Sequence, residues 1–124
     1  MDRIKLLNLL AFLVVFIFVV NFLAFKFFWY YSFWYFDIIM HFLGGLWLGL
    51  CAIYFFSFGT SFWSMFRVVF FVFTLGLAWE IYELFFNNYL AQNPFDTADF
   101  FSDIFFDLLG GLCAILYTWK KLQR

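Results

Sequence analysis

The segment LLNLLAFLVVFIFVVNFLAF, from Leu6 to Phe25, contains no charged side chain. A transmembrane helix needs about 20 consecutive and mostly apolar residues, so this segment is long enough to cross a bilayer. Three further stretches meet the same criterion, at Phe36–Phe56, Val68–Phe86 and Phe100–Trp119. The sequence therefore predicts an all-α, polytopic membrane protein with four transmembrane helices, which form a single transmembrane domain over residues 1–124.

The composition of the chain agrees with this prediction. Hydrophobic residues make up 68% of the 124 positions and charged residues 12%, whereas a soluble domain has about half and about a quarter. In a bilayer the outer surface is itself apolar, and membrane lipids are then the expected partners. A net charge of −1 without a basic stripe excludes a nucleic acid as partner. Cys51 and Cys113 lie inside apolar runs without CxxC spacing, so we expect them to serve as small packing residues.

The basic residues indicate the orientation in the membrane. With four spans, both termini and the middle loop lie on one side. That side carries six of the seven Lys and Arg residues: Arg3, Lys5, Arg67, Lys120, Lys121 and Arg124. The positive-inside rule therefore predicts a multi-pass protein of the inner (plasma) membrane with both termini in the cytoplasm. The first span resembles a signal peptide, but it has full spanning length and no small-x-small cleavage site precedes Lys26, so we expect a retained anchor.

Acidic residues gather on the opposite side of the membrane. Together with His41, they form three pairs with helical spacing. The pairs are Asp37 and His41, Glu80 and Glu83, and Asp103 and Asp107. Residues three or four positions apart share one face of a helix. At a rise of about 1.5 Å per residue, the deeper members lie roughly 6 to 10 Å inside the ends of their spans. The spacing predicts an acidic, histidine-containing cup between three helices beneath the outer surface. We expect Asp99 to cap the fourth span and Asp96 to be a solvated loop residue.

Glycines continue the same helix faces toward the cytoplasmic side. These predicted helix-packing residues are Gly44, Gly45, Gly76, Gly110 and Gly111. Small residues allow membrane helices to approach closely. In addition, residues 37–46 (DIIMHFLGGL) match residues 103–112 (DIFFDLLGGL) at six of ten positions. This repeat suggests a parallel duplication of a two-helix hairpin, although convergence on one packing pattern explains it equally well.

Carboxylates at membrane depth require a partner, because an unpaired charge there is costly. The alternatives are protons shared between the acids or a bound cation. The candidate metal ligands are Asp37, His41, Glu80, Glu83, Asp103 and Asp107. This oxygen-rich set with one imidazole suits Mg, Mn or Fe(II), or Zn with fewer ligands; otherwise no cofactor is expected. His41 and Glu80 are the candidate catalytic residues, as ligand or general base.

These motifs resemble the VanZ-like and YjdF-like group of small bacterial membrane proteins. That group shows an Asp-x3-His-Phe motif, a Glu-x2-Glu or Glu-x2-Gln motif, and an Asp-x3-Asp or Asp-x3-Asn motif before glycines. These match Asp37 to Phe42, Glu80 to Glu83 and Asp103 to Gly111. The acidic residues at Glu83 and Asp107 favour the YjdF-like side, whose members tend to be longer. The resemblance implies a bacterial inner membrane protein, and it implies little about mechanism.

Three classes of function follow from these observations. The first is a metal-dependent hydrolase or transferase that acts on a lipid-linked substrate at the outer leaflet, where only a metal could bind a phosphate. The second is a cation or proton transporter or channel component, which the lack of ionisable residues in the inner halves of the helices disfavours. The third is an accessory structural protein held together by a protonated cluster. Because the bundle is small, we also expect a homo-oligomer.

Overall fold

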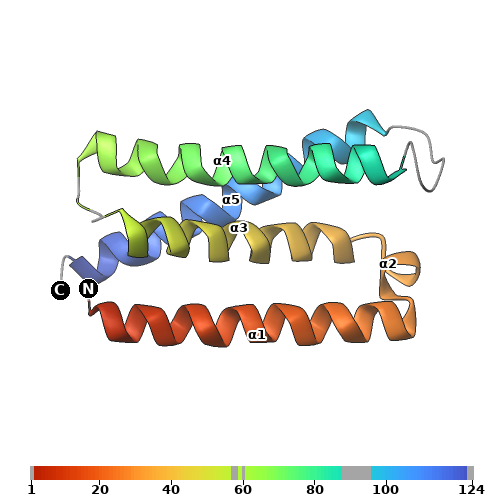
Figure 1. Ribbon diagram of the computed structural model, residues 1–124, viewed down its shortest axis with the longest axis horizontal. Coiled ribbons are helices and arrows are strands. Elements are labelled where there is room, and N and C mark those ends of the chain that lie inside the picture. The colour runs from red at the N-terminus through yellow and green to blue at the C-terminus, as the bar shows by residue number, and fades with distance from the viewer. Residues whose placement is uncertain (1, 57–58, 60, 88–95, 123–124) are drawn as a thin grey trace.

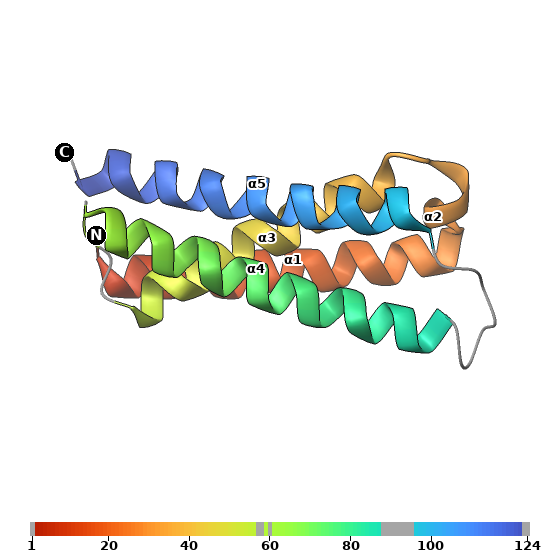
Figure 2. The ribbon, with the colours of Figure 1, turned by 90° about the horizontal axis from the view of Figure 1, so that it is seen from above.

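The computed structural model describes residues 2–56, 59, 61–87 and 96–122, and these residues form helices without any β-strand. The helices are α1 (Arg3–Phe27), α2 (Trp29–Ser32), α3 (Phe36–Phe55), α4 (Phe62–Phe85) and α5 (Thr97–Leu122). The long helices form an elongated bundle in which α1 begins and α5 ends at the same end (Figures 1 and 2). Four of them, α1, α3, α4 and α5, are long and apolar enough to cross a membrane. The predicted all-α polytopic fold is confirmed.

Three of the spans begin earlier than their apolar stretches, and the first of them is α1, which begins at Arg3 instead of Leu6. Helix α4 begins at Phe62 instead of Val68, because Ser61 Oγ accepts a hydrogen bond of 3.3 Å from the Ser64 N–H and caps the helix. Arg67 therefore lies within α4 and not in the middle loop. Helix α5 begins at Thr97, three residues before the predicted Phe100.

The cap of α5 also differs from the prediction. Asp96 Oδ1 accepts a hydrogen bond of 3.2 Å from the Asp99 N–H. The N-cap is therefore Asp96, and the predicted assignment of the cap to Asp99 was wrong. The reason is that a capping side chain belongs to the residue just outside the first helical turn, whereas Asp99 already lies within that turn. Arg124, one of the residues used to predict the orientation, lies outside the described residues.

The connection between α1 and α3 is short and aromatic. Phe28 adopts a left-handed conformation (φ 59°, ψ 37°), and its N–H donates to the Ala24 carbonyl, which ends α1. In α2, the Tyr30 hydroxyl donates a hydrogen bond of 2.6 Å to Asn21 Oδ1, and the Tyr30 ring packs edge-on against Phe36 with 4.8 Å between the ring centroids. These contacts fix α2 across the end of α1 and α3 (Figure 1).

The apolar core fills the half of the bundle that contains both ends of the chain. Its buried members are Leu6, Leu10, Leu50, Cys51, Ala52, Ile53, Val68, Ala114 and Ile115. Helix α1 packs against α3, where Trp47 Nε1 donates a hydrogen bond of 3.0 Å to the Leu10 carbonyl. Both cysteines are free. Among the described residues, α1 does not pack against α4 or α5, so its core residues join the bundle through α3.

Helices α3 and α5 pack with their backbones in direct contact. A Cβ atom at Gly45 would collide with the backbone carbonyl of Asp107, and one at Gly110 would collide with the carbonyl of Phe42. The contact continues at Gly49, where a Cβ would lie 2.8 Å from the Cβ of Ala114. Only glycine permits this approach, which agrees with the predicted packing role of Gly45 and Gly110.

Two further predicted packing glycines lie at the contact between α4 and α5, and one faces no neighbour. A Cβ at Gly111 would lie 3.0 Å from Cγ2 of Val72, and one at Gly76 would lie 2.7 Å from Oδ2 of Asp107. A Cβ at Gly44 would meet no atom within 4 Å. The predicted packing role therefore does not hold at Gly44, because this residue lies one position away from the face that α5 covers.

Candidate metal centre

His41 of α3 is surrounded by carboxylates from its own helix and from α5. Its Nδ1 atom lies 3.0 Å from Asp107 Oδ1. On the opposite edge of the ring, Nε2 lies 3.3 Å from Asp103 Oδ2 and 3.6 Å from Asp37 Oδ1. The imidazole is buried, with 9% of its side chain exposed, whereas 38% of the Asp37 side chain is exposed. The cluster is thus closed around the histidine and reaches the surface at Asp37.

Backbone packing brings Asp107 to the histidine. The carbonyl of Asp107 lies against Gly45, four residues after His41, so α3 and α5 are in contact one turn from the imidazole. The carboxylate of Asp107 in turn occupies the space beside Gly76 of α4 that a side chain there would fill. Two glycines on two neighbouring helices therefore hold the Asp107 side chain in place, which explains why the sequence carries them at this level.

Helix α4 supplies two further carboxylates, which have different surroundings. Glu80 is buried, with an exposed fraction of 4%, and its Oε1 atom has no hydrogen-bond partner among the described residues. Glu83 is only partly buried, and its Oε1 accepts a hydrogen bond of 2.8 Å from Trp79 Nε1. The spacing of the two acids on one face thus produces one deep carboxylate with an unpartnered oxygen and one outer carboxylate that Trp79 holds in place.

Asp103 provides a second buried oxygen without a partner. Its exposed fraction is 1%, the lowest of the acidic residues in the cluster. Although Oδ2 lies 3.3 Å from His41 Nε2, it makes no hydrogen bond with any group in the described part of the chain. Buried polar groups are nearly always hydrogen-bonded, so two such oxygens in one cluster indicate that a partner belongs there.

The donor atoms fall into three overlapping sets. The sets are Asp37, His41 and Asp103; His41, Glu80 and Asp107; and Glu80, Glu83 and Asp103. Within each set, one ligand atom per residue lies within 4.8 Å of the others. That spacing is compatible with ligands around one small cation, whose bonds to oxygen and nitrogen are about 2.0 to 2.6 Å long. Because the three sets share members, the six candidate ligands from three separate helices form one connected cluster.

Sequence reasoning missed two polar side chains at this site. Trp79 is the hydrogen-bond donor to Glu83, and its position four residues earlier on the same helix face is the signal that could have found it. Tyr30 of α2 lies near the cluster as well. Burial, and then the negative charges of Asp37 and Glu83, raise the pKa of Tyr30 to about 12. Its hydroxyl therefore stays protonated at neutral pH and remains a donor to Asn21.

Comparison with known proteins places the chain in a family without adding a function. No curated protein and no solved structure matches it significantly. A family model described as "Predicted membrane protein (DUF2238)" matches residues 1–124. This match agrees with the four spans and with lipid as the surroundings of the helices. The narrower resemblance to the VanZ-like and YjdF-like group stays a prediction. The chain belongs to the DUF2238 family of predicted membrane proteins.

Proposed function

We propose that this chain is a metal-dependent membrane hydrolase or transferase that acts on a lipid-linked substrate at the acidic end of the bundle. One observation carries the proposal: His41 has carboxylates against both ring nitrogens, beside two buried carboxylate oxygens without hydrogen-bond partners. Every ion pair in the described part of the chain involves this histidine, so the acids have no Lys or Arg partner there. A divalent cation is the partner that fits this charge and these donor types.

The ligand sets favour one arrangement around the histidine. Asp37, His41 Nε2 and Asp103 would hold one cation, while the Nδ1–H of the same ring donates to Asp107. A carboxylate behind a metal-bound histidine is a common arrangement, because it fixes the tautomer and the orientation of the ring. Asp107 would then act as the orienting residue and not as a ligand.

A second cation fits the set formed by Glu80, Glu83 and Asp103. Asp103 belongs to both sets, so its two oxygens could bridge two metals, as carboxylates do in the dimetal sites of helical bundles. One nitrogen and several oxygens suit Mg, Mn or Fe(II); Zn would use fewer of them. The unpartnered oxygens of Glu80 and Asp103 would then each have a cation as partner.

The chemistry of such a site is hydrolysis or group transfer. A divalent metal held there supplies a Lewis acid and a water molecule with a lowered pKa. If only the cation at His41 is bound, Glu80 would instead be placed to accept a proton as general base, because its buried Oε1 has no hydrogen-bond partner among the described residues. Lys26 is the only Lys or Arg residue of the sequence at the acidic end of the bundle, so phosphate binding would depend on the metal. Because the cluster lies within the spans, a lipid-linked substrate could reach it from the bilayer.

The main alternative is a cation or proton transporter or channel component. The packing beneath the cluster counts against it, because Gly45, Gly49 and Gly110 bring α3 and α5 into backbone contact there. Ions would need to pass that contact. If purified protein in liposomes conducts cations or protons, the enzyme proposal is wrong. If the triple variant Asp37→Asn, Glu80→Gln, Asp107→Asn keeps the phenotype of the wild type, the accessory structural role is correct instead.

The membrane context of the proposal is a bacterial inner membrane with both termini in the cytoplasm, as the basic residues predict. Labelling of single cysteines introduced at Gln123 and at Tyr31 would test this orientation from the two sides. Homo-oligomerisation is also proposed, since α1 packs against α3 but not against α4 or α5 in the described part of the chain. Crosslinking in membranes that yields monomer only would exclude it.

The experiment that tests the function is elemental analysis of the purified protein, followed by a lipid hydrolysis assay. The wild type should retain a divalent metal, whereas His41→Ala and Glu80→Gln should lose it and elute as folded protein. Asp96→Asn is the matched control, because it removes an acid at the same end and keeps the capping oxygen of α5. A phospholipid and a polyprenyl diphosphate in mixed micelles serve as probes. A wild type that binds none of Mg, Mn, Fe or Zn would rule out the proposal.

A further inference from the structure

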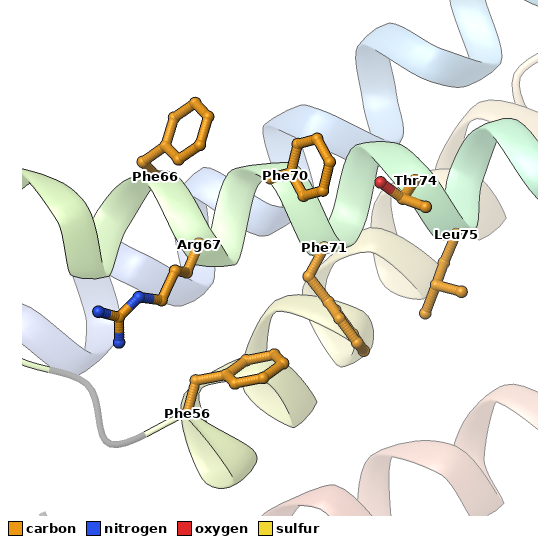
Figure 3. Close-up of a pocket in the computed structure, with 7 residues that line it drawn as sticks. All are labelled: Phe56, Phe66, Arg67, Phe70, Phe71, Thr74 and Leu75. Carbon is orange, nitrogen blue, oxygen red and sulfur yellow. The ribbon is translucent and has the colours of Figure 1, made fainter.

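A groove begins at the other end of the bundle and runs along the first half of α4 as far as Leu75. It has a volume of about 400 Å³ and runs between the end of α3 and the first half of α4 (Figure 3). Phe56 of α3 forms one wall, and its ring packs edge-on against Phe71 of α4 with 5.7 Å between the centroids. The volume falls within the range of about 300 to 1,000 Å³ that is typical of small-molecule sites.

The surface of the groove is apolar, and the charged residue Arg67 lies at one of its ends. Arg67, Phe71 and Leu75 follow one another at intervals of four residues, so they lie on one face of α4 over about 12 Å. Figure 3 shows these three side chains on the side of α4 that faces Phe56. Arg67 lies nearest the α3–α4 connection, at the end of the span, and Leu75 lies toward the middle of the helix. This order matches a phospholipid, which has its charge at the membrane surface and its acyl chain inside.

The Arg67 guanidinium has no acidic partner among the described residues. Seven of the eight acidic residues lie at the opposite end, and the eighth, Asp2, accepts the Ile4 N–H with its carboxylate. Other cations at this end lie over aromatic rings: Arg3 is 4.4 Å from the Tyr54 ring centroid and Lys121 is 5.6 Å from that of Tyr117. A planar guanidinium pairs well with a phosphate through two parallel hydrogen bonds. The exposed Arg67 is therefore available to an anion from outside the chain.

We propose that this groove binds an anionic phospholipid, with its phosphate at Arg67 and one acyl chain along Phe71 and Leu75 toward the bilayer centre. The site is separate from the proposed metal centre and does not depend on it. The occupied leaflet is the one on the side of the chain termini. An anionic lipid is favoured over a zwitterionic one because the end of the bundle that contains the chain termini carries an excess of basic residues.

The test is native mass spectrometry of the purified full chain titrated with phosphatidylglycerol or phosphatidylcholine in neutral detergent. The wild type should bind phosphatidylglycerol more tightly. Arg67→Gln should weaken that binding about tenfold, the effect of one charge-assisted hydrogen bond, and should remove the preference. Lys120→Gln is the matched control, because it removes a cation at the same end outside the groove, and it should bind as the wild type does.

A second variant tests the apolar part of the groove independently of the charge of Arg67. Leu75→Trp keeps Arg67 and fills the apolar part, so it should weaken the binding of both lipids. The proposal is overturned if Arg67→Gln binds phosphatidylglycerol as tightly as the wild type. It is equally overturned if Lys120→Gln loses as much affinity as Arg67→Gln, or if Leu75→Trp changes nothing.

Discussion

The two halves of α3, α4 and α5 are built on opposite principles. In the half that contains the ends of the chain, aliphatic side chains and glycine contacts bring the helices together. In the other half the same helices carry six carboxylic acids and a histidine, of which His41, Glu80, Asp103 and Asp107 are buried. Within a bilayer, close packing stabilises helix association, whereas buried charges oppose it. The apolar half therefore supports a charged half that would not be stable by itself.

The two halves meet at the glycines that hold Asp107. Gly45 brings the backbone of α5 to α3, and Gly76 leaves room for the carboxylate. The packing of one half thus determines the geometry of the other. If this comparison is correct, substitutions in the apolar half should reduce stability, and substitutions in the acidic half should reduce metal binding with little loss of stability.

The largest expected effect is that of Gly110→Leu. Its side chain would collide with the carbonyl of Phe42 and with the backbone of Leu46, so we expect a loss of about 3 kcal/mol or more, or no folded protein. Gly44→Leu is the matched control, because it introduces the same side chain one turn away from His41 into open space. Thermal unfolding in detergent measures both. Equal losses in the two variants would mean that α3 and α5 do not pack as described.

The second effect separates charge from packing. In the presence of a chelator, Glu80→Gln should be at least as stable as the wild type, because it removes a buried charge without a partner. With Mn²⁺ at 100 times its dissociation constant, the wild type should gain about 2.7 kcal/mol and the variant much less. Thermal unfolding with and without Mn²⁺ gives both values. If Mn²⁺ stabilises the variant as much as the wild type, Glu80 is not part of the metal site.

A smaller effect is expected at the boundary between the halves. Gly76→Ala places a methyl group 2.7 Å from Asp107 Oδ2, and the carboxylate must move away from His41. The protein should fold, and its metal affinity should fall about tenfold, as for the loss of an orienting residue. Titration with Mn²⁺ measures the affinity, with Gly44→Ala as the control. An unchanged affinity would show that Asp107 does not orient the histidine.

The smallest effect is that of Tyr30→Phe, which removes the hydrogen bond to Asn21 at the end of the acidic half. A loss of about 1 kcal/mol is expected. Tyr31→Phe should have no effect, since 89% of Tyr31 is exposed. Thermal unfolding of the two variants gives the comparison. If the two variants unfold at the same temperature, the position of α2 does not depend on the hydrogen bond between Tyr30 and Asn21.

Much of this arrangement follows from the sequence because membrane helices are long and regular. Apolar length predicts the four spans, and spacings of three and four residues place each acidic pair on one face. What spacing does not give is the rotation of one helix against its neighbour. Gly44 and Gly45 are equivalent in the sequence pattern, but the contact with α5 selects Gly45 alone. The repeat between α3 and α5 does not reveal this difference either.

The sequence pattern also does not predict the local hydrogen bonds. The start of α4 depends on Ser61 and that of α5 on Asp96, and neither residue stands out from its polar neighbours. The pairing of Trp79 with Glu83 has helical spacing, but tryptophan near the end of a span is equally typical of a membrane interface. Side chains with two common roles can be assigned only once the neighbouring helices are in place.

Pulsed electron paramagnetic resonance of Mn²⁺ bound to the purified protein tests the central claim most directly. If Asp37, Asp103 and His41 Nε2 hold one cation, the spectrum should show coupling to a histidine nitrogen in the wild type. The coupling should disappear in His41→Gln and persist in Asp96→Asn. A wild-type spectrum with water ligands only, identical to that of His41→Gln, would contradict the account.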